Sequence, residues 1–233
     1  GYVDGDDWVT DNWLAEVDKV ITEFHPDIVE YNAFKSTDGK NIEMKTSHFR
    51  GFFDEKEVKE KIIPCMLCDK DQRFYTFGVL PAVWSKMIKT EILRDNLCSE
   101  DKITFGEDVA CIYNSILKCK SFYGIDTPLY YYRQNSQSMT KAYDARRFER
   151  LEVLFAYLNK ELLRNNRQLK SQYDNYILFC VFYASLNEAK NNTSFKEMEK
   201  KFEDGLKRLD LENFVNETTI KIGIPWNVML YFI

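Results

Sequence analysis

Three carboxylates stand within four positions of one another at the start of the chain, in the stretch GYVDGDDW at residues 1–8. Carboxylates this close repel one another and cost stability unless a positive charge lies among them. A divalent cation with oxygen ligands, shared with a phosphate group, would supply that charge. Asp4, Asp6 and Asp7 are therefore candidate metal ligands. The alternative interpretation is an acidic cluster that caps the helix that follows.

A second acidic pair, Glu107 and Asp108, follows Phe105-Gly106 at the expected start of a helix. Glycine permits a tight turn and a close approach by a ligand. A carboxylate at that place can act as a general base if its surroundings set its pKa. Two acids at a helix start also simply complement the helix dipole, so both interpretations stay open for this pair.

Two further stretches carry residues that could bind a sugar or a diphosphate. Arg133 leaves a predicted strand into a hydroxyl-rich loop, where its guanidinium could clamp a diphosphate. The alternative is a surface Arg stacked on Tyr. Trp84, two residues before Lys86, could stack on the apolar face of a sugar ring, although Trp at helical spacing is usually a core residue. His25 and His48 have no partner in the sequence and receive no role.

Composition limits the classes of protein to consider. The 233 residues are 45% hydrophobic, which supports one domain with a real core, alone or with an appendage. A net charge of -5 gives no electrostatic support to nucleic-acid binding. Cys65 and Cys68 form a lone C-x-x-C without a nearby His, so zinc is disfavoured and a reducing, cytoplasmic setting fits best. The apolar end, residues 224–233, is too short to span a bilayer and suggests a packed tail or a peripheral membrane contact.

The hydrophobic spacing predicts an α+β, mostly helical chain. From about residue 143 onward the pattern becomes that of three amphipathic helices, the last of which starts at the capping box formed by Ser194 and Glu197. We therefore expect one domain over residues 1–143 and a helical appendage over 144–233. The elements expected in the first domain are helix 13–24, strand 27–34, turn 36–39, strand 41–45, helix 54–63, a helix from Pro81 with Trp84, Met87, Ile88 and Ile92 on one face, a helix from 105, and strands 121–125 and 128–133.

Four of these stretches, in this order, resemble the motifs of family-two glycosyltransferases. VDGDDW at 3–8 resembles the metal-binding DxD stretch, and WSK at 84–86 resembles the W-x-K segment. FGED at 105–108 resembles the catalytic ED motif, and PLYYYR at 128–133, followed by Ser138, resembles the P-L-Y-x-Y-R…S segment. The order and separations resemble those of bacterial enzymes that build capsular polysaccharide, exopolysaccharide or lipopolysaccharide. The resemblance covers residues 1 to about 143.

The resemblance implies the C-terminal half of a GT-A fold and transfer of a sugar, with inversion, from a nucleotide-diphosphate donor to a glycan or lipid-linked acceptor. It implies a divalent metal, Mn²⁺ or Mg²⁺, and a cytoplasmic protein at or near the inner face of the membrane. The roles it implies are metal binding by Asp6, Asp4 and Asp7, donor binding by Asp4, Arg133 and Lys86, base catalysis by Asp108 beside Glu107, and acceptor binding by Trp84.

The chain departs from the family pattern in two places. Many relatives carry a His after the Arg, where this chain has Gln134-Asn135-Ser136. The family's nucleotide-binding half also precedes the DxD strand, at which this sequence begins. We therefore expect this chain to fold but not to catalyse alone. Residues 1–8 should form an unpaired strand end that is either weakly restrained or in contact with a neighbouring chain. The alternative from another class is a non-catalytic helical interaction module whose carboxylates only cap helices.

Overall fold

The computed structural model describes residues 1–69, 75–97, 103–134, 142–191 and 193–211. The chain divides into two compact units. The first comprises residues 1–67, 77–99 and 107–138, and the second comprises 68–76, 100–106 and 139–233. The prediction of a single boundary at residue 143 differs from this division, because segments 68–76 and 100–106 group with the later helices.

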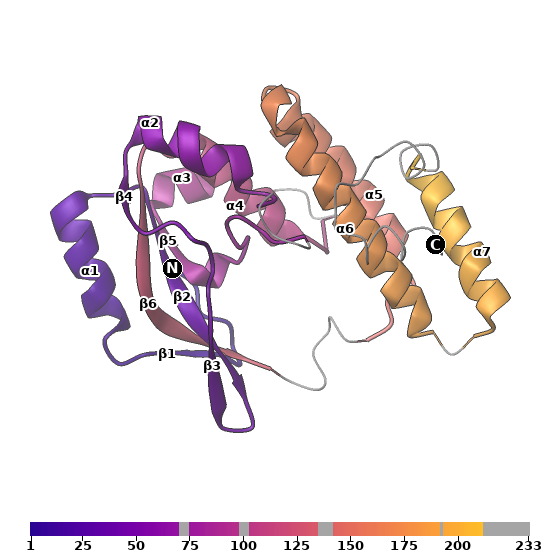
Figure 1. The fold of residues 1–233 in the computed structure, drawn as a ribbon, viewed down its shortest axis with the longest axis horizontal. Coiled ribbons are helices and arrows are strands. Elements are labelled where there is room, and N and C mark those ends of the chain that lie inside the picture. The colour runs from indigo at the N-terminus through magenta and orange to yellow at the C-terminus, as the bar shows by residue number, and fades with distance from the viewer. Residues whose placement is uncertain (70–74, 98–102, 135–141, 192, 212–233) are drawn as a thin grey trace. The chain divides into compact units, whose positions relative to one another are not determined.

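A six-stranded sheet forms the first unit, with β2 (Ile28–Thr37) and β6 (Phe122–Arg133) as its parallel central pair (Figure 1). Along the free edge of β2, β5 (Lys86–Ile88) and β3 (Lys40–Met44) pair antiparallel with its first and second halves. Along the free edge of β6, β4 (Gly51–Phe53) and β1 (Trp8–Val9) pair in the same way. β2 and β6 thus form the base on which the short strands are placed.

Both faces of β2 are covered, which is why its first six residues are all buried. Successive side chains of a strand point to opposite faces. Val29, Tyr31 and Ala33 therefore share the face on which helix α1 (Trp13–Phe24) packs through Val17 and Val20. The predicted helix over residues 13–24 is confirmed. Its C-cap is His25, which adopts the left-handed conformation just before Pro26.

A buried ion pair joins β2 to β5 on the other face. Lys86 Nζ lies 3.1 Å from Glu30 Oε1, and both side chains are fully enclosed. The two residues are direct cross-strand neighbours. Ser47 Oγ donates to the second oxygen of Glu30, and Lys86 Nζ donates to the Leu80 carbonyl oxygen at 2.5 Å. Burial lowers the pKa of Lys86, whereas the charge of Glu30 opposes that shift.

The helix predicted from Pro81 is wrong. Val83–Ser85 forms one 3₁₀ turn, residues 86–88 form β5, and helix α3 covers only Thr90–Asp95. The apolar spacing in this stretch resembles that of a helix, but pairing with β2 and the Lys86–Glu30 contact stabilise the extended backbone instead. Tyr31 also anchors the turn, because its hydroxyl donates to the Trp84 carbonyl oxygen at 2.7 Å.

The two strands predicted over 121–133 are one strand with a bulge. Tyr31 pairs with Ile125 and the next residue of β2 pairs with Pro128, so the register shifts between them. Proline cannot donate to a strand ladder and is tolerated at such bulges. The bulge presents Asp126, which accepts from Arg50 Nε at 2.6 Å and from Lys45 Nζ at 2.8 Å.

The remaining helical predictions are confirmed in position. In the first unit, α2 (Glu55–Glu57) continues through further helical turns to Cys65, and α4 covers Glu107–Lys118. The second unit contains α5 (Arg147–Leu158), which runs on to Leu163, together with α6 (Lys170–Ala189) and α7 (Phe195–Arg208). The Ser194–Glu197 capping box is formed as expected. Across the described ranges, no helix is both long and apolar enough to cross a membrane.

The buried ion pair gives a test of this fold. Lys86→Met should cost about 3–5 kcal/mol of unfolding free energy, because it leaves the Glu30 carboxylate buried without its cation. The double variant Glu30→Gln/Lys86→Met should recover a large part of that loss. Lys45→Met is the control, since Lys45 meets Asp126 in solvent and should change stability little. Urea unfolding measures all three, and a Lys86→Met cost no larger than the control would contradict the enclosed pair.

Candidate functional site

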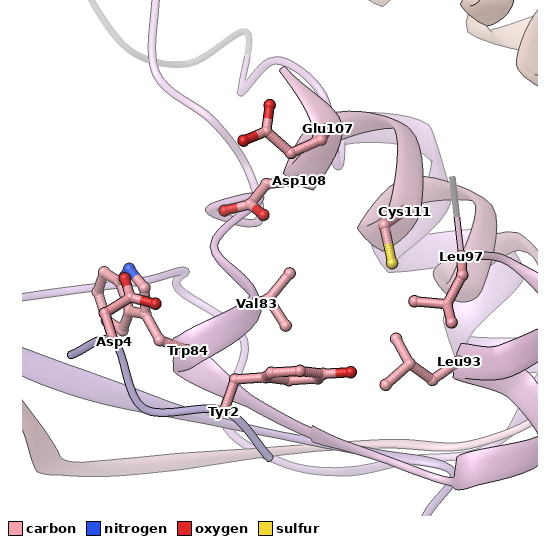
Figure 2. Close-up of a pocket in the computed structure, with 9 residues that line it drawn as sticks. All are labelled: Tyr2, Asp4, Val83, Trp84, Leu93, Leu97, Glu107, Asp108 and Cys111. Atoms are coloured by element: carbon pink, nitrogen blue, oxygen red, sulfur yellow. The ribbon is translucent and has the colours of Figure 1, made fainter. Parts of the chain in front are cut away.

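A pocket of about 310 Å³ lies in the first unit, between the opening residues, the turn before β5 and helices α3 and α4 (Figure 2). Figure 2 shows the carboxylates of Glu107, Asp108 and Asp4 on one side and Leu93, Leu97 and Cys111 on the other. Tyr2, Val83 and Trp84 complete the lining. Three of the predicted stretches, namely the opening acids, the stretch with Trp84 and the Glu107-Asp108 pair, therefore meet at one cavity.

Helix α4 aims Asp108 into this pocket. Residues three apart share one face of a helix, so Asp108 and Cys111 both reach the cavity. The opposite side of the helix is held in the core by buried residues such as Ala110 and Tyr113. Gly106, immediately before the helix, has a φ of 76°, a conformation that glycine adopts without strain. The carboxylate is thus presented by a rigid element rather than by a loop.

The surroundings of Asp108 raise its pKa to about 6. The largest cause is burial, and the neighbouring charges of Glu107 and Asp4 add to it. A hydrogen bond from the backbone of Val83 and the charge of Lys86 act in the opposite direction. A carboxylate with this pKa is ionised at neutral pH yet is a stronger base than an ordinary aspartate.

Tyr130 holds the opening residues against β6. Its hydroxyl accepts a hydrogen bond from the Asp4 backbone N–H at 3.0 Å and donates one to Asp7 Oδ2 at 2.8 Å. The Arg133 backbone N–H donates to the other oxygen of Asp7 at 2.8 Å, and Trp8 pairs with Tyr131. The expectation of an unpaired strand end at residues 1–8 is therefore wrong, because β6 supplies the missing partner.

The opening carboxylates differ in their surroundings. Asp4 lines the pocket, and its pKa is raised by burial and by the charges of Asp7 and Asp6. Asp7 has both oxygens engaged by β6, and burial still raises its pKa. Asp6 is exposed and does not line the pocket. The three neighbours that the sequence suggested as metal ligands therefore do not point to one common centre.

A cation fits this site only with help from a ligand. In the part of the chain that the structure describes, no three His, Cys, Asp or Glu side chains form a group that could hold a metal ion. Magnesium is often held by one or two carboxylates plus substrate phosphates and water. Burial raises the pKa of Asp4, and the negative charges of Asp7 and Asp6 add to that shift. Asp4 and Asp6 therefore suit a cation shared with a diphosphate better than a cation held by the protein alone.

Of the other predicted site residues, Trp84 lines the pocket, whereas Lys86 and Arg133 do not. Trp84 is only 8% exposed, and its ring stacks on Tyr130 and Tyr132 at centroid distances of 4.6 and 5.4 Å. Lys86 is enclosed by its contact with Glu30. The Arg133 guanidinium lies 5.3 Å from the centre of the Trp8 ring. This contact resembles the alternative interpretation of a stacked surface Arg, with Trp8 in place of a Tyr.

Sequence reasoning missed several residues of the site: Tyr2, Val83, Leu93, Leu97, Cys111 and the hydroxyl of Tyr130. A signal existed for Cys111, which lies one helical turn after Asp108. Tyr2 likewise stands two positions before Asp4 in an extended segment. Leu93 and Leu97 gave no usable signal, because α3 was predicted in the wrong place and Leu97 lies in the connection after it.

Comparison with known proteins identifies the fold but not a sequence family. No protein-family model matches the sequence, and no curated protein matches it. The structure is similar to that of residues 1–349 of Staphylococcus aureus TarS, a glycosyltransferase, with a TM-score of 0.55 and 14% identity over 90% of this chain. A second TarS structure, in complex with UDP-GlcNAc, gives a TM-score of 0.53 and 15% identity, again over 90% of this chain. This chain covers only 54% and 56% of those two TarS chains. At this level of identity the likeness establishes the fold alone: the chain has a mixed α/β, glycosyltransferase-like fold.

Proposed function

We propose that this chain carries the acceptor and catalytic side of an inverting, family-two glycosyltransferase of the GT-A type. Its donor is a nucleotide-diphosphate sugar and its acceptor is a glycan or a lipid-linked molecule, as in bacterial surface polysaccharide synthesis. The observation that carries the proposal is Asp108, a carboxylate with a pKa of about 6 held by a rigid helix in a pocket beside Asp4. The setting we propose is the cytoplasm, at the inner face of the membrane.

The chemistry assigned to the chain's own residues is proton removal and orientation. Asp108 accepts the proton of an acceptor hydroxyl, whose oxygen forms a bond to the anomeric carbon. The bond from that carbon to the diphosphate oxygen breaks on the opposite face, so the configuration inverts. Burial and the charge of Glu107 raise the basicity of Asp108, while the charge of Lys86, held in place by Glu30, offsets part of that shift.

The donor side of the proposal rests on the opening acids. Asp4 and Asp6 would hold Mn²⁺ or Mg²⁺ together with the diphosphate, and Asp7 would keep that segment bound to β6. A bound cation would neutralise the charge that develops on the leaving diphosphate. Because a TarS structure contains UDP-GlcNAc, this compound is the first donor to test. Screening nucleotide sugars for nucleotide release, with the protein as its gene encodes it, tests the proposal as a whole.

The pH dependence of turnover tests the role of Asp108. A base with a pKa of about 6 must be ionised, so kcat should rise with pH through about pH 6 and level off above it. Asp108→Asn should lower kcat at least about a hundredfold and remove this limb, with little change in donor affinity. Asp18→Asn, at an exposed position of α1, is the control. Near-normal turnover of Asp108→Asn would return Asp108 to a helix-start role.

The same substitution should stabilise the protein at neutral pH. The pKa of Asp108 is higher in the folded state than its ordinary value of 3.8, so the folded state binds the proton more tightly. Ionised Asp108 therefore lowers stability above about pH 6, and this penalty fades as the pH falls toward 4. Asp108→Asn should raise the unfolding free energy by about 1–3 kcal/mol at pH 7.5 and by much less at pH 4.5.

Urea unfolding at these two pH values measures the difference, again with Asp18→Asn as the matched control. A helix-start carboxylate without a catalytic role predicts the opposite sign, because its removal costs favourable interaction with the helix dipole. Destabilisation by Asp108→Asn at pH 7.5 would therefore argue for the alternative, a helical interaction module.

The cation proposal predicts coupled binding. Mn²⁺ should bind weakly alone and markedly more tightly in the presence of UDP, because the diphosphate supplies part of its ligands. Asp4→Asn and Asp6→Ala should each reduce that enhancement at least about tenfold, whereas Asp11→Asn, exposed just before α1, should not. Calorimetric titration of Mn²⁺ with and without UDP gives the result. Equal Mn²⁺ affinity in all variants would remove Asp4 and Asp6 from the site.

A further inference from the structure

The pocket beside Asp108 is divided into a charged side and an apolar side. Leu93, Leu97 and Cys111 face the carboxylates across the cavity, with Val83 between the two sides and Tyr2 along the bottom of the view (Figure 2). Cys111 is buried, whereas the side chain of Leu97 is 50% exposed at the edge of the cavity. A ligand that covered this exposed apolar surface would gain free energy in proportion to the area removed from water.

The described residues on the charged side of the pocket include no compensating cation. Among the described residues that line the pocket, three are acidic and none is basic. Lys86 lowers the pKa of Asp108 in part, but it is paired with Glu30 at 3.1 Å and does not line the cavity. An anionic group placed beside Asp4 and Asp108 would therefore be repelled. Removing it from water would also cost free energy that no favourable contact in the pocket offsets.

We propose that this pocket binds an uncharged glycoside that carries an apolar alkyl or aryl group, and that it rejects an anionic counterpart. The sugar hydroxyl lies at Asp108, and the apolar group lies against Leu93, Leu97 and Cys111. This inference rests on the proposed function in treating the pocket as an acceptor site. It narrows the acceptor to molecules whose negative charge, if any, lies outside this cavity.

The size of the cavity limits the occupant. At about 310 Å³ it stands at the small end of ligand pockets, which run from about 300 to 1,000 Å³. One sugar ring with a short apolar substituent fits such a space, whereas a longer oligosaccharide would have to extend beyond it. The pocket therefore recognises a single terminal glycoside of the acceptor.

Three probes separate the contributions of the apolar group and of charge: hexyl β-glucoside, methyl β-glucoside and glucose 6-phosphate. Saturation-transfer NMR with the chain, without donor or metal, measures their dissociation constants. Hexyl glucoside should bind at least about fivefold more tightly than methyl glucoside, since each buried methylene contributes to affinity. Glucose 6-phosphate should bind more weakly than both. Equal affinity for hexyl and methyl glucoside, or preferential binding of the phosphate, would overturn the proposal.

Matched variants place the binding in this pocket. Leu97→Asn should remove most of the preference for hexyl glucoside, whereas Leu14→Asn should leave it unchanged. Both leucines are exposed in the first unit, Leu14 at 64%, so neither substitution opens the core. The double variant Asp4→Asn/Asp108→Asn should reduce the discrimination against glucose 6-phosphate at least about fivefold. A hexyl preference that survives Leu97→Asn intact, or unchanged discrimination in the double variant, would refute the assignment.

These results are separable from the test of transferase activity. The probe binding needs neither a nucleotide sugar nor a cation. Binding of hexyl glucoside that depends on Leu97, in a protein that releases no nucleotide from any donor, would sustain the pocket assignment and defeat the proposed function. Transfer to a phosphorylated acceptor with no preference for an apolar group would do the reverse.

Discussion

The buried contact between Glu30 and Lys86 is the constraint on which the first unit depends. Two opposite charges enclosed without water are costly unless they meet each other, so their pairing sets the register of β5 against β2. That register places the turn carrying Trp84 beside the pocket and fixes a positive charge near Asp108. The same pair therefore shapes the local backbone and the electrostatics of the proposed base. A hydrophobic pair could replace its contribution to stability but not its charge.

A second constraint acts through β6, whose alternation divides three consecutive tyrosines between the two faces of the sheet. Tyr130 and Tyr132 stack against Trp84 in the core, while Tyr131 stacks on Trp8. The hydroxyl of Tyr130 then joins the opening acids to the sheet. Most aromatic residues that a sequence reading would assign to sugar stacking thus build the frame of the site, and only Trp84 among them also lines the pocket.

The charge balance of the pocket links stability to function. Burial, together with the nearby Glu107 and Asp4, makes ionised Asp108 unfavourable in the folded state, and that unfavourable charge is what would make it the base that we propose. In the same proposal, the negative charge would favour a cation shared with a diphosphate near Asp4 and would disfavour an anion in the acceptor space. One distribution of carboxylates therefore accounts for the basicity, the proposed metal and the proposed acceptor preference.

The sequence alone determined the elements whose signals are local: the helices over 13–24 and 107–118, the hairpin at 36–39 and the capped helix after Ser194. It also indicated the acids that meet at the pocket, because their types and order carry the resemblance. Long-range pairing decided the rest. Lys86–Ile88 became a strand because β2 and Glu30 offered partners that periodicity cannot reveal. The opening acids were anchored by Tyr130, 126 positions from Asp4, and Leu97 joined the cavity only through the tertiary structure.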